Sequence, residues 1–459
     1  MSSRIEPWSR RLTLAAVCSA LAAVQLYAFH WGVITPDTVV QYEQALSGRY
    51  DDWHPPITAA LWRQLLHLGS GGAPFLLLDL ALYWTALGLV ADRLRRSAHP
   101  LAALLPIAIG LFPVTFGQMG AILKDPLMAA LMLMATALLI LGEDAGRRWL
   151  AILAVPVLLL AAATRFNALF AAWPLLICAM PASWTRNTRG LWAVGLGAGA
   201  LLVVTPWMIN DVALRPTHSH PFHSLVNFDL AGIVAQGGTN GYPMLGDKQV
   251  RALVAHCYDP RLFGQKDEAG CAETEDAIAA YVAQRDESAL GLWLNAVLTS
   301  PAAWARHRLA HVNWNWRFAI PTVPGDAVYM MSAPNARGLH FAPNALTLGV
   351  VEAAGMVARS PIGRPATWLA LAFGLLFAAA GSRHQRIIQA LAASALFYGG
   401  AYALVSVAPD LRYNLWTMLA TMLALALLIA ERPALSPLRW IVLAGPAVGA
   451  AIVEIAALT

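Results

Sequence analysis

Residues 11–30, RLTLAAVCSALAAVQLYAFH, decide the class of this fold, because they are long enough and apolar enough to cross a lipid bilayer as one helix. Pro36-Asp37-Thr38 follows this stretch closely, and Tyr50-Asp51-Asp52-Trp53-His54-Pro55-Pro56 comes shortly afterwards. Three carboxylates, a histidine and a Pro-Pro turn therefore gather in one loop, directly beyond a predicted membrane span.

Similar apolar stretches recur along the chain. A helix needs about 20 residues to cross the roughly 30 Å of hydrocarbon in a bilayer. The chain has 459 residues, of which 58% are hydrophobic and 12% are charged, whereas soluble domains carry about 25% charged residues. We expect spans at residues 11–30, 73–91, 100–117, 125–141, 149–164, 167–181, 190–209, 366–381, 387–407, 412–430 and 439–457. The sequence thus predicts an all-α polytopic membrane protein of about eleven transmembrane helices.

The basic residues between the spans predict the orientation of the chain. Cytoplasmic loops carry an excess of Lys and Arg, a rule that does not extend to long loops such as residues 210–365. With the N-terminus in the cytoplasm, 14 arginines fall on that side, against five basic residues opposite. The 14 are Arg4, Arg10, Arg11, Arg93, Arg95, Arg96, Arg147, Arg148, Arg186, Arg189, Arg383, Arg386, Arg432 and Arg439; the five are Arg49, Arg63, Lys124, Arg165 and Arg412. This distribution predicts an external C-terminus, and it explains the isoelectric point of about 9.1 without a nucleic-acid partner.

The chain divides into three predicted regions. Residues 1–209 form an N-terminal transmembrane module whose first outer loop spans 31–72. Residues 210–365 form a large outer loop with interfacial helices, and residues 366–459 form the C-terminal transmembrane helices. In the large loop, residues 247–298 and the segment after Ser300-Pro301 have helical periodicity, and an amphipathic stretch at 344–358 is expected to lie flat on the membrane surface.

Cysteine usage agrees with an outer location for the large loop. Cys257 and Cys271 lie in that loop, where an oxidising compartment permits a disulfide between them. Cys18 and Cys178 fall inside predicted spans and are expected to be buried packing residues.

Every conspicuous polar group lies on the outer side in this topology. Each one alone has an ordinary explanation, as a solvated anchor, a helix cap or a cation that extends to lipid headgroups. Their common side indicates a shared site instead. The groups are Asp37, Asp51, Asp52 and His54 in the first loop, Lys124-Asp125-Pro126 in the second, Arg165-Phe166-Asn167 in the third, and Asp410 with Arg412-Tyr413-Asn414 in the last.

Such a set of residues suits transfer from a phosphate-linked donor. A carboxylate can accept the proton of an attacking hydroxyl group. Arginine and lysine can bind a phosphate and stabilise its charge as it leaves. Next to a membrane, one base and a cationic clamp are the groups that a lipid-linked phosphate donor requires.

The layout resembles the GT-C superfamily of polytopic glycosyltransferases, which use polyprenyl-phosphate sugars. Asp37 stands where those enzymes carry a key acidic residue after the first span, and Asp52-Trp53-His54-Pro55-Pro56 is similar to the D-x-H-P-P segment of protein O-mannosyltransferases (family 39). Lys124-Asp125, Arg165-Phe166-Asn167 and Arg412-Tyr413-Asn414 resemble the additional motifs of an uncharacterised bacterial branch. Thr38 follows Asp37 where protein mannosyltransferases have glutamate, and no β-trefoil-like insertion is seen, so mannose and a protein acceptor are not favoured.

The resemblance implies roles for these residues. Asp37 would be the catalytic base of an inverting transfer on the periplasmic side of a bacterial inner membrane. The predicted partners are a polyprenyl-phosphate sugar donor, membrane lipids and an unidentified hydroxyl acceptor. Asp51, Asp52, His54 and Asp125 would act on the acceptor side or support the loop, and Arg412, Tyr413, Lys124 and Arg165 would bind the donor phosphate.

Metal dependence stays open at this point, because the superfamily contains enzymes with and without a divalent metal. Asp37 with Asp125 or His54 could supply ligands. His218, His220 and His223 have a suitable spacing but no convincing fourth ligand. No other cofactor is expected.

Two other functional classes compete with this interpretation. A transporter or flippase of lipid-linked saccharides would place ionisable groups near the membrane midplane and often shows inverted repeats. Here only Asp79 and Glu454 interrupt the span interiors, and no repeat is visible. A ligase or polymerase of surface glycans would share the donor chemistry without requiring the acidic first loop.

Overall fold

The computed structural model describes residues 8–97, 99–144, 146–264, 268–285, 288–322, 327–328, 330, 332–431 and 435–458. Arg4 and Arg432, which entered the orientation count, lie outside these residues. In chain order the helices are α1 (Trp8–Ala28), α2 (Pro36–Ser47), α3 (Ile57–Leu65), α4 (Ala73–Ser97), η1 (Pro100–Ala103), α5 (Leu104–Gly110), α6 (Pro113–Gln118), α7 (Lys124–Gly142), α8 (Arg148–Ala163), α9 (Ala168–Ala179), α10 (Thr188–Trp207), η2 (Met208–Ala213), α11 (Phe222–Ala235), α12 (Asp247–Cys257), α13 (Glu268–Arg285), α14 (Ala289–Thr299), α15 (Pro301–Trp316), α16 (Ala345–Ala358), η3 (Pro361–Gly363), α17 (Pro365–Ala378), α18 (Gln385–Val405), η4 (Leu411–Asn414), α19 (Leu415–Glu431) and α20 (Pro437–Leu458).

The prediction of an all-α polytopic membrane protein is confirmed. Among the described residues, seven segments are long and apolar enough to cross a membrane: α1, α4, α7, α10 with η2, α18, η4 with α19, and α20. The other four predicted spans coincide with shorter apolar helices, namely η1 with α5, α8, α9 and α17. Extended pairing in the described chain amounts to three isolated β-bridges.

One predicted span is wrong as a single helix. Residues 100–117 form η1, α5 and α6, and the helical run ends at Leu111 before Phe112 adopts an extended conformation. Pro113 opens α6, and the residue before a proline is disfavoured in the α region. The composition of this stretch is suitable for a span, but the proline breaks the helix.

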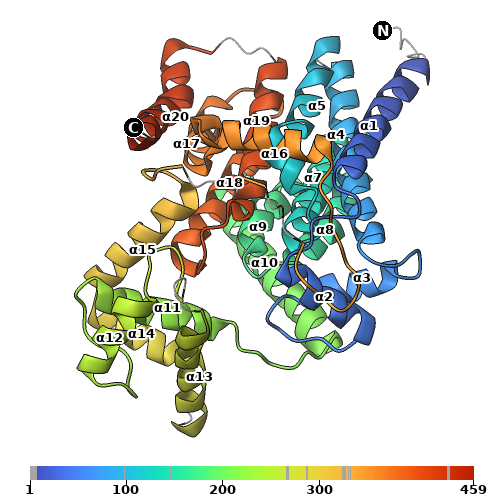
Figure 1. The fold of residues 1–459 in the computed structure, drawn as a ribbon. Coiled ribbons are helices and arrows are strands. Elements are labelled where there is room, and N and C mark those ends of the chain that lie inside the picture. The colour runs from blue at the N-terminus through green and yellow to red at the C-terminus, as the bar shows by residue number, and fades with distance from the viewer. Residues whose placement is uncertain are drawn as a thin grey trace.

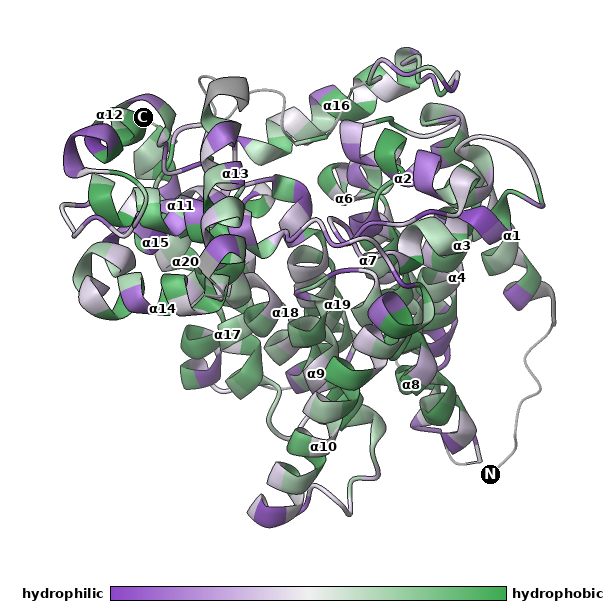
Figure 2. Cartoon of the chain, turned by 90° about the horizontal axis from the view of Figure 1, so that it is seen from below, coloured by the Kyte–Doolittle hydropathy of each residue, from purple (hydrophilic) through white to green (hydrophobic). Residues whose placement is uncertain are grey.

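The core of the bundle is built around α7 and α19. Nearly every residue of α7 is buried, from Asp125 to Gly142, and most of α19 is buried as well. In contrast, α1, α10 and α20 expose most of their apolar surface, which a bilayer would cover. Figure 2 shows hydrophobic residues along the bundle helices and more hydrophilic residues in the α12–α13 region.

The loops of the bundle gather at two ends. At one end, Arg93 pairs with Asp144, and His384 pairs with Glu143. At the other end, which we call the α2 end, the loop before α2 forms a bridge from Val33 to Ala121 in the α6–α7 loop. In Figure 1, α2 and α3 lie low, and the start of α1 lies at the top.

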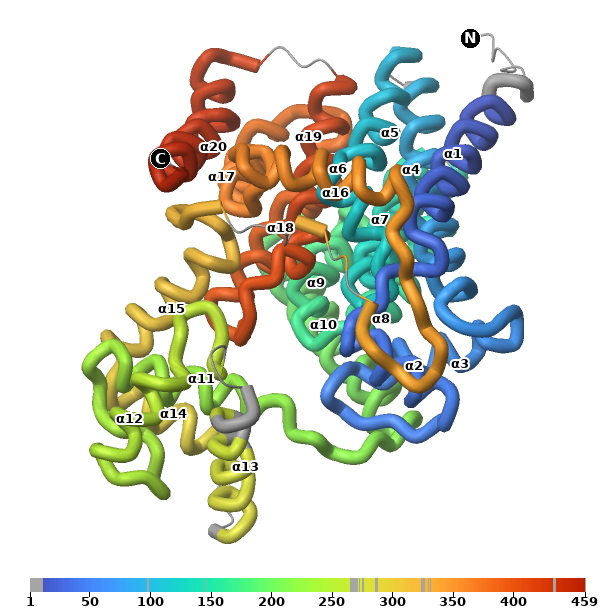
Figure 3. Tube along the Cα trace, in the orientation of Figure 1, coloured from blue at the N-terminus to red at the C-terminus, as the bar shows by residue number. Residues whose placement is uncertain are grey.

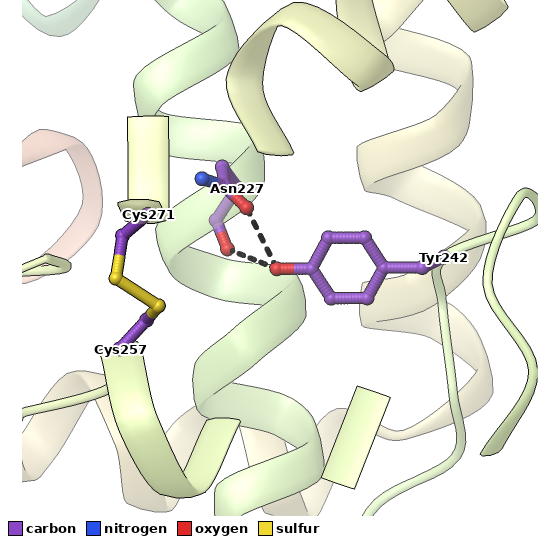
Figure 4. The surroundings of a disulfide bond; sticks show 4 residues. All are labelled: Asn227, Tyr242, Cys257 and Cys271. Carbon is purple, nitrogen blue, oxygen red and sulfur yellow. Dashed lines mark hydrogen bonds between the residues drawn. A yellow bond between two sulfur atoms is a disulfide. The ribbon is translucent and has the colours of Figure 1, made fainter. Parts of the chain in front are cut away.

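The region between η2 and η3 contributes a separate helical lobe, α11 to α15, at the lower left of Figures 1 and 3. The lobe has its own apolar core, which includes Val226, Leu230 and Ile278. The predicted disulfide between Cys257 and Cys271 is present and joins the end of α12 to α13. Figure 4 shows this bond beside Tyr242, whose hydroxyl donates to the carbonyl of Asn227 at 3.0 Å.

The predicted amphipathic segment at 344–358 forms α16. It runs across the bundle in Figure 1, at a steep angle to α4 and α7. Asn344 caps its first turn and also donates to the carbonyl of Tyr27 at 2.8 Å. Thr347 donates to the carbonyl of Ala28. These bonds fasten α16 to the C-terminal end of α1, immediately before the loop that leads to Asp37.

Candidate active site

Local capping fixes the position of Asp37. Thr35 is the N-cap of α2, and its side chain and that of Thr38 satisfy each other's backbone amides. Such a capping box satisfies two of the amides that a helix start leaves unpaired. The hydroxyl of Thr38 also donates to the carbonyl of Ile122 at 2.8 Å. The start of α2, with Asp37 in its first turn, is therefore held against the loop that leads into α7.

The Asp37 carboxylate lies between two groups from distant parts of the chain. Arg412 Nη2 donates to Oδ2 at 3.2 Å, and His54 Nε2 lies 3.6 Å from Oδ1. The side chain of Asp37 keeps 28% of its surface exposed. The carboxylate is thus oriented by partners on both oxygens and is still accessible to an incoming molecule.

His54 connects Asp37 to Lys124. Its ring is buried, and Nδ1 lies 2.5 Å from Lys124 Nζ. An ammonium group only donates, so a protonated Lys124 would place the lone pair of His54 on Nδ1 and its proton on Nε2, which faces Asp37. Burial and the charge of Lys124 lower the pKa of His54, and the neighbouring Asp37 does not fully offset them. The imidazole is therefore neutral at pH 7.

The charges around Asp37 keep it ionised. Burial alone would raise its pKa, but the hydrogen bond from His54 and the charges of Lys124 and Arg412 outweigh burial and lower the pKa well below its usual range. We call these four residues (Asp37, His54, Lys124 and Arg412) the Asp37 cluster. It combines an ionised, accessible carboxylate with a guanidinium group and a lysine amine at the α2 end of the bundle.

A second group lies beside the first. Arg165 forms an ion pair with the buried Asp125, and its Nε donates to Asn167 at 2.8 Å. The Arg165 guanidinium lies 4.3 Å from the ring centroid of Tyr413, and Arg412 lies 5.5 Å from the same ring. Both guanidinium groups therefore lie near the ring of Tyr413. We call Asp125, Arg165 and Tyr413 the Arg165 cluster.

Asp51 and Asp52 lie apart from both clusters. Asp51 accepts a hydrogen bond from the amide of Trp53 at 3.0 Å, which closes a local turn. Asp52 accepts from Ser219 N at 2.5 Å and from His218 Nδ1 at 2.9 Å. These contacts fasten the first loop to the segment before α11.

The side chains that could ligate a metal do not form a preassembled metal site in the part of the chain that the structure describes. Among the described residues, no group of three or more His, Cys, Asp or Glu side chains is arranged to hold a metal ion. Of the two predicted companions of Asp37, His54 faces it, whereas Asp125 is committed to Arg165. The rings of His218, His220 and His223 are stacked, with centroids 6.1 and 5.2 Å apart along the series.

Two positioning residues of α15, Arg308 and Asn315, were not predicted from the sequence. Arg308 Nη1 on α15 donates to the carbonyl of Ser406 at 2.6 Å. Asn414 Nδ2 donates to the backbone carbonyl of Asn315 at 3.1 Å. Helix α15 of the lobe thus holds the loop that carries Arg412. The sequence pattern that could have revealed this role is the row of polar residues along one face of α15. Their periodicity alone does not show which groups they contact.

Asn210, in the π-helical turn η2, makes a comparable link at the first loop. Its side-chain oxygen accepts from the amide of Ile57, and its nitrogen donates to the carbonyl of Ala163, both at 2.9 Å. This residue joins the start of α3, just beyond His54-Pro55-Pro56, to the end of α8.

No protein-family model matches the chain, and no curated protein matches it. The chain is similar to a solved structure described as ArnT from Cupriavidus metallidurans bound to undecaprenyl phosphate, with 15% sequence identity and a TM-score of 0.36, over 93% of this chain and 78% of that one.

Proposed function

We propose that this chain is a membrane glycosyltransferase of the GT-C type. It would transfer a sugar from a polyprenyl-phosphate donor to a hydroxyl acceptor on the periplasmic face of a bacterial inner membrane. The observation that carries the proposal is the Asp37 cluster: an accessible carboxylate within 3.2 Å of Arg412 Nη2 and 3.6 Å of His54 Nε2, at one end of a bundle of apolar helices.

The proposed reaction is a single displacement. The acceptor oxygen forms a bond to the anomeric carbon of the sugar, and the bond from that carbon to the phosphate oxygen breaks. The polyprenyl phosphate leaves with the electron pair, and the hydroxyl proton passes to Asp37. One displacement inverts the anomeric configuration. The transition state of glycosyl transfer resembles an oxocarbenium ion, so the proton is lost late and a carboxylate of low pKa is a sufficient base.

The cations would act on the donor. Arg412 can present two parallel N–H groups to a phosphate, whereas Lys124 supplies a point charge. Negative charge grows on the phosphate oxygen as the sugar leaves, and cations fixed nearby stabilise that charge without reorganisation. The ring of Tyr413, which lies near both Arg412 and Arg165, would hold both guanidinium groups in place.

A transporter or flippase is the main alternative. It would need ionisable groups that bind or couple within the spans. Asp79 and Glu454 are buried on α4 and α20, but these two side chains belong to helices on different sides of the bundle (Figure 1). The Asp37 and Arg165 clusters, in contrast, lie together at the α2 end of the bundle, which favours transfer chemistry there.

The test uses the purified full-length protein in lipid nanodiscs. It is incubated with a panel of polyprenyl-phosphate hexoses and pentoses, together with an envelope extract that supplies hydroxyl acceptors. Mass spectrometry then measures the release of free polyprenyl phosphate and the mass added to the acceptor. We expect both to appear in equal amounts. Movement of the intact lipid-linked saccharide across a vesicle without its cleavage would instead identify a flippase, and growth of a lipid-linked glycan would identify a polymerase.

Replacement of His54 tests whether it orients Asp37 or transfers a proton. In His54→Gln, the amide can still accept from Lys124 and donate to Asp37, so we expect the transfer rate to stay within about tenfold of wild type. His54→Leu removes both contacts and leaves buried polar groups unpaired, so we expect a larger loss. A Gln variant as inactive as the Leu variant would show that the imidazole itself is required.

A further inference from the structure

A groove of about 750 Å³ lies between α1 and α4, on the flank of the bundle. Its walls are apolar or small side chains, including Ala15 and Leu26 of α1 and Leu77 and Trp84 of α4. None of its lining residues belongs to the Asp37 or Arg165 cluster. The groove follows helices that we expect to lie in the hydrocarbon region, so its occupant must be apolar over most of its length.

Close approach of the two helices explains why the groove forms beside their contact. A methyl group added at Gly88 would lie 3.0 Å from Cys18 Sγ, so α1 and α4 touch there because Gly88 has no side chain. Beside this contact, small residues such as Ala22 and Ala81 leave the space between the helices unfilled. If this space stayed empty, the side chains that line it would lose dispersion contacts.

One end of the groove is basic. Arg11, Arg96 and Arg147 line it together with Asp92. Asp92 is already engaged, because it pairs with Arg96 at 2.8 Å and with Arg95 at 2.8 Å. Arg11 and Arg147 are exposed, and neither has an ion-pair partner within the described part of the chain. Three guanidinium groups against one shared carboxylate leave this end net positive.

The length of the groove identifies the occupant more closely. From Arg11 to Leu26, α1 rises about 22 Å at 1.5 Å per residue. One leaflet contributes about 15 Å of hydrocarbon, and the remaining distance matches a headgroup at the interface. The groove therefore fits a lipid that spans a single leaflet with its headgroup at the end of the bundle opposite Asp37.

We propose that this groove binds an anionic diacyl phospholipid. Its phosphate would lie among Arg11, Arg96 and Arg147, and an acyl chain would fill the channel between α1 and α4. Basic pockets between transmembrane helices bind anionic headgroups in this way. The lipid would hold α1 against α4, and α1 in turn leads into the loop that positions Asp37. This inference does not depend on the proposed reaction.

The test measures lipid binding to the delipidated full-length protein by native mass spectrometry and by thermal unfolding. Phosphatidylglycerol and phosphatidylcholine of equal chain length are added separately in a neutral detergent. We expect phosphatidylglycerol to bind at one site and raise the unfolding temperature, and phosphatidylcholine to bind much more weakly. The double variant Arg11→Gln/Arg147→Gln should weaken phosphatidylglycerol binding at least about tenfold, because each basic residue near a lipid headgroup contributes roughly fivefold.

Two further variants separate this site from general attraction to a charged surface. Arg186→Gln/Arg189→Gln removes two exposed arginines from another loop and should leave phosphatidylglycerol binding unchanged. Ala22→Leu narrows the channel and should weaken binding while all the arginines remain. The proposal is wrong if both double variants have equal effects, if phosphatidylcholine binds as tightly, or if a polyprenyl phosphate or a second copy of the chain displaces phosphatidylglycerol from the groove.

Discussion

Asp37→Asn is expected to lower the rate of glycosyl transfer by about 10²- to 10⁴-fold, the range over which a positioned general base contributes to catalysis. The amide has the same shape as the carboxylate and can still accept from Arg412, but it cannot take a proton from the acceptor hydroxyl. Because the amide fills the same space and Asp37 keeps 28% of its side-chain surface exposed, we expect the variant to remain folded, although it loses the attraction between the carboxylate and Arg412. Activity and stability should therefore separate in this variant.

The matched control for Asp37→Asn is Glu43→Gln. Glu43 lies on the same helix, α2, and makes only an exposed pair with Arg337 at 3.3 Å. Both variants replace a carboxylate by its amide, and both can be measured by release of polyprenyl phosphate and by thermal unfolding in the same nanodiscs. Glu43→Gln should behave as wild type in both assays. An Asp37→Asn protein that retains wild-type release would rule out Asp37 as the base.

Much of the fold was predictable, because each membrane span is a continuous apolar stretch of the sequence. Helix α7 is buried along almost its whole length, and its sequence is one nearly continuous apolar stretch. The disulfide from Cys257 to Cys271 followed from the expected location of its loop. The break at Phe112 was missed because hydropathy is averaged over a window, whereas a single proline decides where a helix ends.

The candidate site was predictable only as a set of loops. The sequence indicated that the loops bearing Asp37, Lys124, Arg165 and Arg412 share one side, but not how their residues pair. His54 contacts Lys124 across 70 positions, and adjacent Asp125 turns instead to Arg165. Neighbours in a motif can thus belong to different clusters, because α7 rotates successive side chains by about 100°. Such pairing depends on how the helices pack.

The role of α15 illustrates a second limit. Its bonds to Ser406 and Asn414 hold the loop that carries Arg412. Arg308 donates to the backbone carbonyl of Ser406, a group that every residue possesses, so no residue type at that position could have indicated the contact. Asn414 donates to both the backbone carbonyl and the side-chain oxygen of Asn315, but two asparagines 99 positions apart carry no sign in the sequence that they pair. The large loop had been predicted as a surface element, and its contribution to the geometry of the site follows only from the packing of α15 against the bundle.

Arg412→Ala should raise the concentration of lipid donor that transfer requires far more than the concentration of acceptor. Removal of one fixed group that stabilises developing negative charge typically costs about 10²- to 10³-fold in rate, and we expect kcat/KM for the polyprenyl-phosphate donor to fall by this amount. Arg412→Lys keeps the charge but loses the paired N–H groups, so its loss should be intermediate. Arg49→Ala removes an exposed cation of the first loop and should leave kcat/KM for the donor unchanged. An Arg412→Ala protein with unchanged donor dependence would mean that Arg412 only anchors its loop.

The pH dependence of the same variant gives an independent measurement, because Arg412 also acts on Asp37. The charge of Arg412 is one of the influences that lower the pKa of Asp37, so its removal must raise that pKa. The base must be ionised to accept a proton, and activity is therefore lost as the pH falls through the pKa of Asp37. In the wild type this loss should begin below the usual pKa range of an aspartate, whereas in Arg412→Ala it should begin at a higher pH. Arg412→Lys retains the charge, so it should keep the wild-type acid limb even though its affinity for the donor is reduced. This difference separates the electrostatic effect of Arg412 on the base from its contact with the phosphate.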